Sequence, residues 1–157
     1  MNKSRYVIRP IDSTDRAIIA ALFESGRMTI KKLATRIDMS SPSVSGRILK
    51  LEDAGAILGY AVIIDPKVFG LNTAAHVRIR AFPGEMKRIE QLLCDTPQVI
   101  EAERVSGDDG FVTKVVVKDE QELQAVIDRF LPFASTDVAI ILSSTVTRRL
   151  PKLCGAT

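Results

Sequence analysis

Apolar residues at helical spacing form three short runs in the first third of the chain, over residues 12–26, 29–37 and 41–55. Asp12 and Asp15 stand at the N-cap and N3 positions of the first run, and the first and third runs each end at a glycine. The residues that share an apolar face are Ile11, Ile18, Ile19 and Leu22, then Ile30, Leu33, Ala34 and Ile37, then Val44, Ile48 and Leu51. The pattern predicts three short helices, with Thr29 capping the second.

The connection between the second and third predicted helices is short. Asp38 tolerates the left-handed backbone conformation that a tight turn often needs. Ser41 is a good N-cap for the third helix, and Pro42 is pre-organised for its first position. Ala34 is small at a place where two helices approach closely. These features favour a helix-turn-helix, although an ordinary three-helix packing unit fits the same pattern.

The period of the pattern changes in the rest of the chain. Residues 56–66 predict a strand that ends at an Asp-Pro turn and serves as a wing or a linker. The other predicted elements are strands over 73–82, 99–106, 111–118 and 136–147, a helix with Met86, Ile89, Leu92 and Leu93, and a helix capped by Asp119 with Leu123, Val126, Ile127, Phe130 and Leu131. The order β-α-β-β-α-β predicts an α+β, ferredoxin-like domain, with two helices on one face of a four-stranded antiparallel sheet.

No helix remains to cover the second face of this sheet. The strands over 111–118 and 136–147 carry apolar residues on both sides, namely Val112, Val116, Val138, Ile140, Ile141 and Leu142. Because an apolar sheet face favours pairing with another subunit, we predict a dimer through the C-terminal domain. The whole pattern divides the chain into a basic tail, a helix-turn-helix domain, a linker strand and a ferredoxin-like domain, over residues 1–11, 12–58, 59–72 and 73–157.

Charge is distributed unevenly along the chain, whose formal net charge is +3. Residues 1–55 carry ten Lys and Arg against six Asp and Glu, whereas residues 56–157 carry twelve against thirteen. A positive excess confined to the first third of the chain is the electrostatic footprint of a nucleic-acid-binding module joined to a neutral domain. A solvated basic surface without a partner has the same composition.

Composition excludes several other classes of protein. With 157 residues and a hydrophobic fraction of 46%, the chain is typical of one ordinary soluble domain or two small ones. Its apolar runs are far shorter than the roughly 20 residues that span a bilayer, and the N-terminus lacks a signal peptide, so we expect a cytoplasmic protein without membrane contact. Cys94 and Cys154 are too few for a disulfide framework or a four-cysteine zinc site. The single histidine is His76, and the sequence has no phosphate-binding glycine loop, so we expect neither an enzyme nor a cofactor.

Over about residues 11–151, these features resemble the Lrp/AsnC regulators, also called feast/famine regulatory proteins. The matching strings are Ile11-Asp12-x-x-Asp15-x-x-Ile18-Ile19-x-x-Leu22, Gly26-Arg27-Met28-Thr29-x-x-x-Leu33-Ala34, Met39-Ser40-x-x-x-Val44-x-x-Arg47-Ile48-x-x-Leu51-Glu52-x-x-Gly55-x-Ile57-x-Gly59-Tyr60, Asp65-Pro66, Gly70, and Gly107 before Phe111. The string from Arg47 to Tyr60 is the most specific, because it joins a recognition helix to a linker strand.

The resemblance implies a bacterial or archaeal transcription factor. Its N-terminal domain would bind double-stranded DNA. Its C-terminal domain would form dimers, assemble them into larger rings that are often octamers, and sense a small molecule that is usually an amino acid. Only the resemblance implies the amino-acid effector, whereas DNA binding and a dimerising α+β domain also follow from the residues themselves.

The third predicted helix supplies most candidate DNA-binding residues. Gly46 is at the centre of the face opposite the apolar stripe, where it allows close approach to a groove or is a tolerated surface glycine. Arg47 matches the recognition-helix arginine of the family, and the alternative is an ion pair with Glu52 or Asp53. We expect Arg47→Ala to weaken specific DNA binding without unfolding the dimer. The candidates are Ser41, Pro42, Ser43, Ser45, Gly46, Arg47 and Lys50, with Lys31 and Arg36 either on phosphates or solvated.

The effector loop of the family has the pattern Gly-x-x-Asp followed by an aromatic residue. In this chain Gly110 stands at the aspartate position, and the acid is one place earlier, at Asp109. The candidate effector-binding residues are Gly107, Asp108, Asp109, Gly110, Phe111, Ser135 and Thr136. An amino-acid ligand needs a carboxylate for its ammonium and N–H donors for its carboxylate, which the two aspartates and the glycine turn would supply. A plain hairpin turn with solvated acids is the alternative.

Three other functions compete with a sequence-specific regulator. An architectural protein would bind many DNA sites through charge and multivalency. A small enzyme is compatible with a ferredoxin-like domain, because a fold does not define a function. A free-standing amino-acid sensor would act through protein partners instead of DNA. The sequence leaves open the target genes and the direction of regulation.

Overall fold

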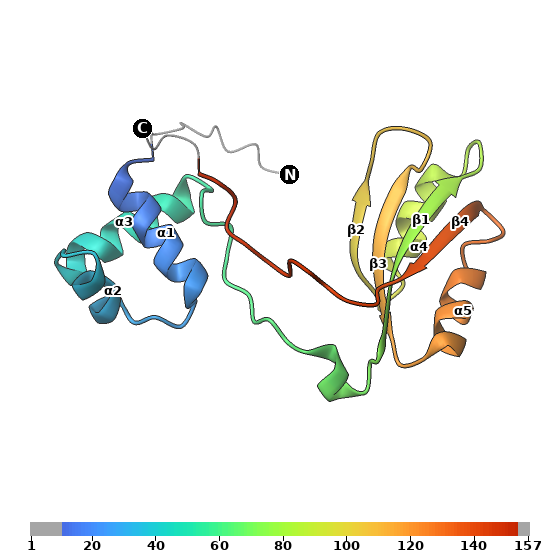
Figure 1. The fold of residues 1–157 in the computed structure, drawn as a ribbon. Coiled ribbons are helices and arrows are strands. Elements are labelled where there is room, and N and C mark those ends of the chain that lie inside the picture. Colours follow the sequence, from blue (N-terminus) through green and yellow to red (C-terminus); the bar gives the residue numbers. More distant parts are fainter. Residues whose placement is uncertain (1–10, 154–157) are drawn as a thin grey trace. The chain divides into compact units, whose positions relative to one another are not determined.

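The structure is a computed structural model that describes residues 11–153 of the chain. The basic tail expected over residues 1–11 falls almost entirely outside the described residues, as does Cys154. The chain divides into two compact units: one comprises the residues up to Ile63 together with those from Val146 onward, and the other is Ile64–Thr145 (Figure 1). Sequence analysis assigned the residues from Val146 onward to the C-terminal domain, whereas the structure groups them with the helical unit.

The helical unit contains α1 (Ser13–Glu24), α2 (Ile30–Arg36) and α3 (Ser41–Asp53). Its core is one cluster of buried side chains, made of Ile18, Ala21, Leu33, Ala34, Val44, Ile48 and Leu51. These side chains lie on the faces that the helical spacing predicted, whereas Ile11 and Ile30, which were predicted on the same faces, are exposed. The contacts of α1 and α2 with α3 therefore hold the third helix with one face inward and one face outward.

Local capping explains where these helices begin and end. Asp12 and Asp15 form a capping box, in which the main-chain N–H of Asp15 donates to Asp12 Oδ1 at 2.7 Å, and Thr29 caps α2 as predicted. Gly26 follows Ser25, the C-cap of α1, as expected for a glycine that ends a helix, whereas α3 has Ser40 instead of the predicted Ser41 as its N-cap. Pro42 occupies the first turn of α3, where its missing N–H leaves no helical bond unmade.

The turn between α2 and α3 uses the left-handed region as predicted. Asp38 has a φ of 54° and is the only non-glycine residue with a positive φ among the described residues. This conformation reverses the chain in one step, so that α3 begins a few residues after α2 ends.

The predicted strand over residues 56–66 does not form. This stretch is irregular and is followed by a short 3-10 helix, η1 (Pro66–Phe69). A strand requires a hydrogen-bonded neighbour, and the sheet contains only four strands, none of them from this segment. The segment therefore leaves large apolar side chains in solvent, with Leu58 91% and Val62 88% exposed.

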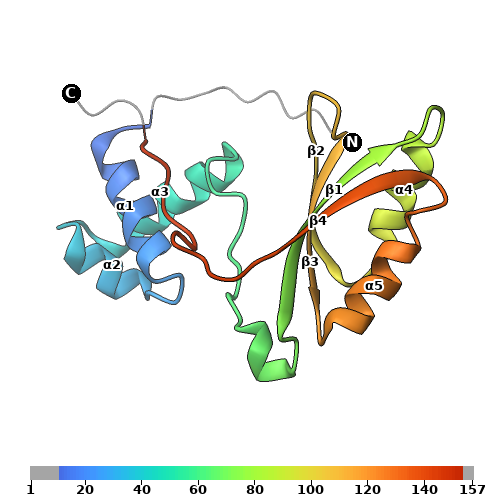
Figure 2. The same ribbon diagram turned by 45° about the vertical axis from the view of Figure 1, so that its right-hand side comes forward.

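The second unit has the predicted β-α-β-β-α-β order. Its elements are β1 (Thr73–Ala81), α4 (Met86–Cys94), β2 (Val99–Arg104), β3 (Phe111–Val117), α5 (Glu120–Asp128) and β4 (Ala134–Ile140). The strands pair antiparallel in the order β2-β3-β1-β4, which is the ferredoxin-like arrangement. Both helices lie on the same side of the sheet, as Figure 2 shows, and bury a core that includes Val77, Ile79, Ile89 and Phe130.

The second face of the sheet is more polar than we predicted. The cross-strand register puts Val138 and Ile140 opposite Val77 and Ala75, on the side that the helices cover. The face away from the helices carries Ala74, His76, Arg78, Arg80, Glu101, Glu103, Val112, Lys114, Val116, Ser135, Asp137 and Ala139. Val112 and Val116 therefore lie on this face as predicted, whereas Val138 and Ile140 do not, and apolar residues are a minority on it.

The last strand also differs from the prediction. We expected it over residues 136–147, whereas β4 begins at Ala134 and ends at Ile140. The main-chain N–H of Ile141 makes one further bond, to the carbonyl of Ala74 at 2.8 Å. Because β1 begins at Thr73, the chain beyond this point runs past the end of its neighbour and has no strand to pair with.

Candidate nucleic-acid interface and effector loop

The outward face of α3 presents the residues that sequence analysis selected. Pro42, Ser43 and Lys50 are exposed, whereas Ser41, Ser45, Gly46 and Arg47 are partly buried. A Cβ added to Gly46 would meet no atom within 4 Å, so packing inside the unit does not require a glycine there. The face is therefore short, polar and open, which suits contact with a groove.

Sequence analysis missed two residues on this surface. Leu49 is 60% exposed beside Lys50, although it stands in an apolar run. Ser40 caps α3, and its hydroxyl lies 2.8 Å from that of Ser43. Leu49 could have been predicted from the sequence, because a helical projection of α3 places this residue on the outward face.

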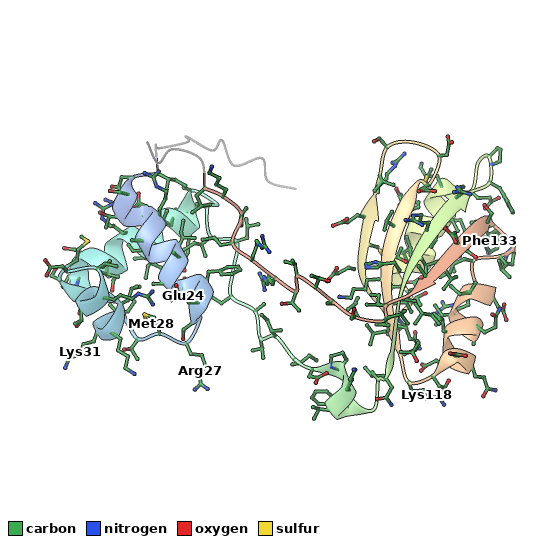
Figure 3. All side chains as sticks on the ribbon, viewed as in Figure 1. Glu24, Arg27, Met28, Lys31, Lys118 and Phe133 are labelled. Atoms are coloured by element: carbon green, nitrogen blue, oxygen red, sulfur yellow. The ribbon has the colours of Figure 1, made fainter. Side chains whose placement is uncertain are left out.

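Lys31 and Arg36 of α2 differ in their surroundings. Lys31 lines a shallow hollow between α2 and α3 whose other lining residues are Ala34, Thr35, Asp38, Met39, Ser40 and Ser41. Its side chain points away from the helical unit in Figure 3. Arg36 instead forms an ion pair of 2.7 Å with Glu24 of α1. The charge of Arg36 is thus partly balanced inside the unit, whereas the ammonium group of Lys31 faces solvent.

Arg47 joins α3 to the start of α1. Its Nη1 atom lies 2.6 Å from Asp12 Oδ2 and 2.7 Å from Asp15 Oδ1, so its partners are not the expected Glu52 or Asp53. Asp15 is almost fully buried, with 4% of its surface exposed. The hydrogen bonds that Arg47 donates, first to Asp12 and then to Asp15, raise its pKa above the ordinary value. These two ion pairs set the orientation of α3 against α1.

Glu52 has a different partner, in the segment after the helix. It accepts a hydrogen bond of 2.9 Å from the hydroxyl of Tyr60. Burial first and then the neighbouring Glu52 carboxylate raise the pKa of Tyr60 above 10.0. This hydrogen bond connects the first part of the segment after α3 to the last turn of that helix.

The candidate effector loop is the tight turn from Gly107 to Gly110, between β2 and β3. Gly107 and Gly110 have φ values of 94° and 69°, which favour glycine. A Cβ at Gly110 would lie 3.2 Å from the carbonyl oxygen of Ile79. The backbone at the family's aspartate position therefore disfavours a side chain in this chain.

Asp109 is held by two arginines of β1. Arg80 contacts Asp109 Oδ1 through Nε at 3.0 Å and Nη2 at 2.9 Å, and Arg78 lies 3.7 Å from its Oδ2. Arg78 also pairs with Asp137 of β4 at 3.0 Å. Asp108 is exposed, and no ion pair to it is found among the described residues. The two arginines were absent from the predicted set, although they alternate with buried apolar residues along β1.

The sheet register brings the other effector candidates near this loop. Phe111 and Thr136 both lie opposite Ile79, on the side that the helices cover. Ser135 lies opposite Arg80, on the other side. The seven candidates therefore gather around one end of β1, although the sheet separates Ser135 from Thr136.

Family models match both units of the chain. The model described as the Lrp/AsnC ligand binding domain covers residues 74–151, and the model described as winged helix-turn-helix DNA-binding covers residues 11–57. The HTH-type transcriptional regulator YezC of Bacillus subtilis is 31% identical over 86% of this chain and 96% of its own length. The chain belongs to the Lrp/AsnC family.

Solved Lrp/AsnC structures share this architecture. LrpC of Bacillus subtilis matches with a TM-score of 0.85 and 25% identity, over 89% of this chain and all of LrpC. A feast or famine regulatory protein from Mycobacterium tuberculosis, complexed with L-methionine, matches with a TM-score of 0.78 and 28% identity, over 89% of this chain and 97% of that one. The chain is thus an Lrp/AsnC-type transcriptional regulator, with a DNA-binding winged helix-turn-helix and a ligand-binding domain of the α+β class.

The Lrp/AsnC regulators are not enzymes, which agrees with the sequence prediction for this chain. Within residues 11–153, no group of three or more His, Cys, Asp or Glu side chains is placed to hold a metal ion. No helix in this described range is long and apolar enough to cross a membrane.

Proposed function

We propose that this Lrp/AsnC protein is a sequence-specific regulator that reads double-stranded DNA with α3 and responds to an amino acid or a related small metabolite. The outward face of α3 carries this proposal. Ser43 and Lys50 present donors suited to base edges and phosphates, and the exposed Leu49 suits the methyl group of thymine. Ser41, Pro42, Ser45 and Gly46 complete the face, and Lys31 supplies a phosphate contact.

Arg47 has a positioning role in this proposal. Both of its ion pairs use Nη1, and no hydrogen bond of its Nε or Nη2 to a described residue is found. The arginine therefore holds α3 against α1 while its remaining N–H groups are available to a phosphate. Arg36, paired with Glu24, contributes less to phosphate binding than Lys31.

The proposed effector site is the end of β1 with the turn from Gly107 to Phe111. The relative from Mycobacterium tuberculosis with bound L-methionine supports an amino-acid ligand. In this chain Asp109 is engaged by Arg80, so Asp108 would meet the ligand's ammonium, and main-chain N–H groups of the turn would meet its carboxylate. Ser135 and Thr136 would line the site from β4.

Dimerisation would give the regulator two copies of α3, one from each subunit, with which to contact DNA. The large apolar side chains in solvent support a dimer, and they are Leu58, Val62, Ile63, Ile64, Val68, Phe69, Val138, Ile140 and Leu142. A two-fold pair of α3 helices would read half-sites about one helical turn apart, or a multiple of it. Assembly of dimers into octamers would extend such binding over several sites.

Selection of duplexes from a random DNA pool by the purified protein tests this function. A sequence-specific dimer predicts enrichment of one motif with two related halves. Enrichment of no motif, with strong retention of all DNA, would support the architectural alternative instead. Absence of any DNA binding would leave only a sensor that acts through protein partners.

The effector is tested by adding each amino acid, and then related 2-oxo acids, to the protein on its selected duplex. We expect one or a few compounds to change the apparent Kd. Asp108→Asn should weaken that response and leave binding without the compound unchanged, whereas the surface control Glu120→Gln should change neither. A response that Asp108→Asn leaves intact would refute the assignment of Asp108.

A further inference from the structure

Among its described residues, the helical unit owes most of its net positive charge to the end of the chain. Residues 11–63 carry seven Lys and Arg against six Asp and Glu, a net charge of only +1. Residues 146–153 add Arg148, Arg149 and Lys152 and no acid. The other unit, residues 64–145, has nine basic and thirteen acidic residues and is therefore net negative. Of the net charge on the described part of the helical unit, most thus lies in the terminal segment, residues 146–153.

The terminal segment is part of the helical unit in space. The residues from Val146 onward group with those up to Ile63, although more than eighty residues of the other unit separate them in sequence. The guanidinium of Arg148 lies over the ring of Phe23 in α1, 5.7 Å from its centroid. In Figure 1 the last described residues, drawn in red, return to the same helices.

The arginines of this segment are available for an anion. A guanidinium stacked on a ring uses its face, so its N–H groups remain free in the plane to meet phosphate oxygens. Arg148 and Arg149 are exposed, and neither makes an ion pair with a described carboxylate. By contrast, Arg36, Arg47, Arg78 and Arg80 are all paired with acids.

We propose that Arg148 and Arg149 form a second DNA-contacting element, which binds backbone phosphates while α3 reads bases. This inference rests on the proposed function, because it assumes that the helical unit binds DNA. A phosphate contact adds affinity for every sequence and no preference among sequences. Phe23 serves as the platform that holds Arg148 on the helical unit.

The test is the salt dependence of DNA binding by full-length protein. Log Kobs falls against log salt concentration with a slope of about −0.9 per neutralised phosphate. The double variant Arg148→Gln/Arg149→Gln should therefore bind with a slope about 1–2 shallower than wild type. The change should be equal on the selected duplex and on a scrambled one, so their ratio of affinities stays constant.

A matched control separates phosphate contact from loss of net charge. Arg88→Gln/Arg129→Gln removes the same charge from the other unit, and Arg88 likewise stacks on a ring, that of Phe133, at 4.3 Å from its centroid. This control should leave the slope unchanged. Arg149→Gln alone tests the proposal without touching the contact with Phe23, and should make the slope about 0.9 shallower.

An unchanged slope in both Arg149→Gln and the double variant would overturn the proposal, and the segment would then serve only to pack on α1. An equal change in the control variant would overturn it too, since net charge alone would explain the effect. A different result would contradict the proposed function, namely equal affinity of the wild-type protein for the selected and scrambled duplexes. In that case the salt-dependence slopes of wild type and variants on scrambled DNA still test the role of Arg148 and Arg149.

Discussion

At the scale of single residues, Arg47 has the most consequential contacts in the helical unit. Its place on the recognition helix was predicted, whereas its partners Asp12 and Asp15 were not. The two aspartates were interpreted only as capping residues, because capping depends on neighbours in sequence. The ion pair depends on how α1 packs against α3, which the sequence pattern did not define.

We expect Arg47→Ala to destabilise the helical unit. Removal of the guanidinium leaves the buried Asp15 carboxylate without this partner, and the free energy of unfolding should fall by about 2 kcal/mol, since Asp12 is solvent-screened. Chemical denaturation checks this value, with the exposed neighbour Lys50→Ala as the control that should stay near wild type. Equal stability of the two variants would show that the ion pair contributes nothing.

The effector loop shows a similar limit of prediction at the residue scale. The glycines of the turn and the displaced acid at Asp109 were evident in the sequence. The engagement of Asp109 by Arg80 and Arg78 was not, because it requires the register between β1 and β3. A shift of one residue in that register would move both arginines to the other face.

At the scale of elements, helices were predicted more accurately than strands. Asp12, Thr29 and Asp119 cap their helices as expected, since a cap and its helix are adjacent in sequence. Residues 56–66 and 141–147 have apolar, β-branched composition but form no strand, because a strand needs a neighbour in space. The composition of these segments therefore predicted strands, but without a hydrogen-bonded neighbouring strand they remain irregular.

The start of α5 provides a test of pH dependence. The main-chain N–H of Lys118 donates to Glu122 at 3.0 Å and Gln98 adds a second bond, which together lower the pKa of Glu122 below 4.5. A lowered pKa in the folded state stabilises the protein above the ordinary pKa, and this contribution is lost as pH falls through the folded value.

Glu122→Gln should therefore lower the denaturation midpoint of the second unit at pH 7. The difference from wild type should disappear at a pH well below 4.5, where Glu122 is protonated as well. Denaturant titrations at both pH values measure this, and Glu120→Gln controls for the loss of a nearby charge. If the midpoints of wild type and Glu122→Gln still differ at the acidic pH, the ionised carboxylate of Glu122 is not the source of the stabilisation.

One variant of α3 and one of α2 separate reading of bases from binding of the backbone. Ser43→Ala removes a base contact and should relax the preference for one base at one position of the selected motif. Lys31→Ala should lower the affinity for all duplexes alike and make the slope of log Kobs against log salt concentration shallower by about 1. Competition binding against single-base variants of the motif measures both. If Ser43→Ala leaves every preference unchanged, Ser43 does not contact a base.

At the scale of the whole molecule, the order of elements predicted both units and their classes. The grouping of residues 146–153 with the helical unit was not predicted, because this segment follows the last strand in sequence. The polar second face of the sheet likewise emerged only from the register of four strands.

We expect the protein to be a dimer or a larger assembly of dimers at micromolar concentration. The exposed apolar side chains between Leu58 and Phe69 are too many for a free monomer surface. Light scattering coupled to size exclusion measures the mass. Val62→Glu, which adds charge to this segment, should shift the mass toward that of a monomer; a monomeric wild type would contradict the prediction.

The central claim is that this Lrp/AsnC protein recognises DNA sequence. The most direct measurement is fluorescence anisotropy of the selected duplex and of its scrambled form, titrated with full-length protein at several salt concentrations. The account predicts tighter binding to the selected duplex by about 10³-fold or more, and a preference that remains as salt rises. Equal affinity for both duplexes, lost steeply and in parallel with salt, would contradict it.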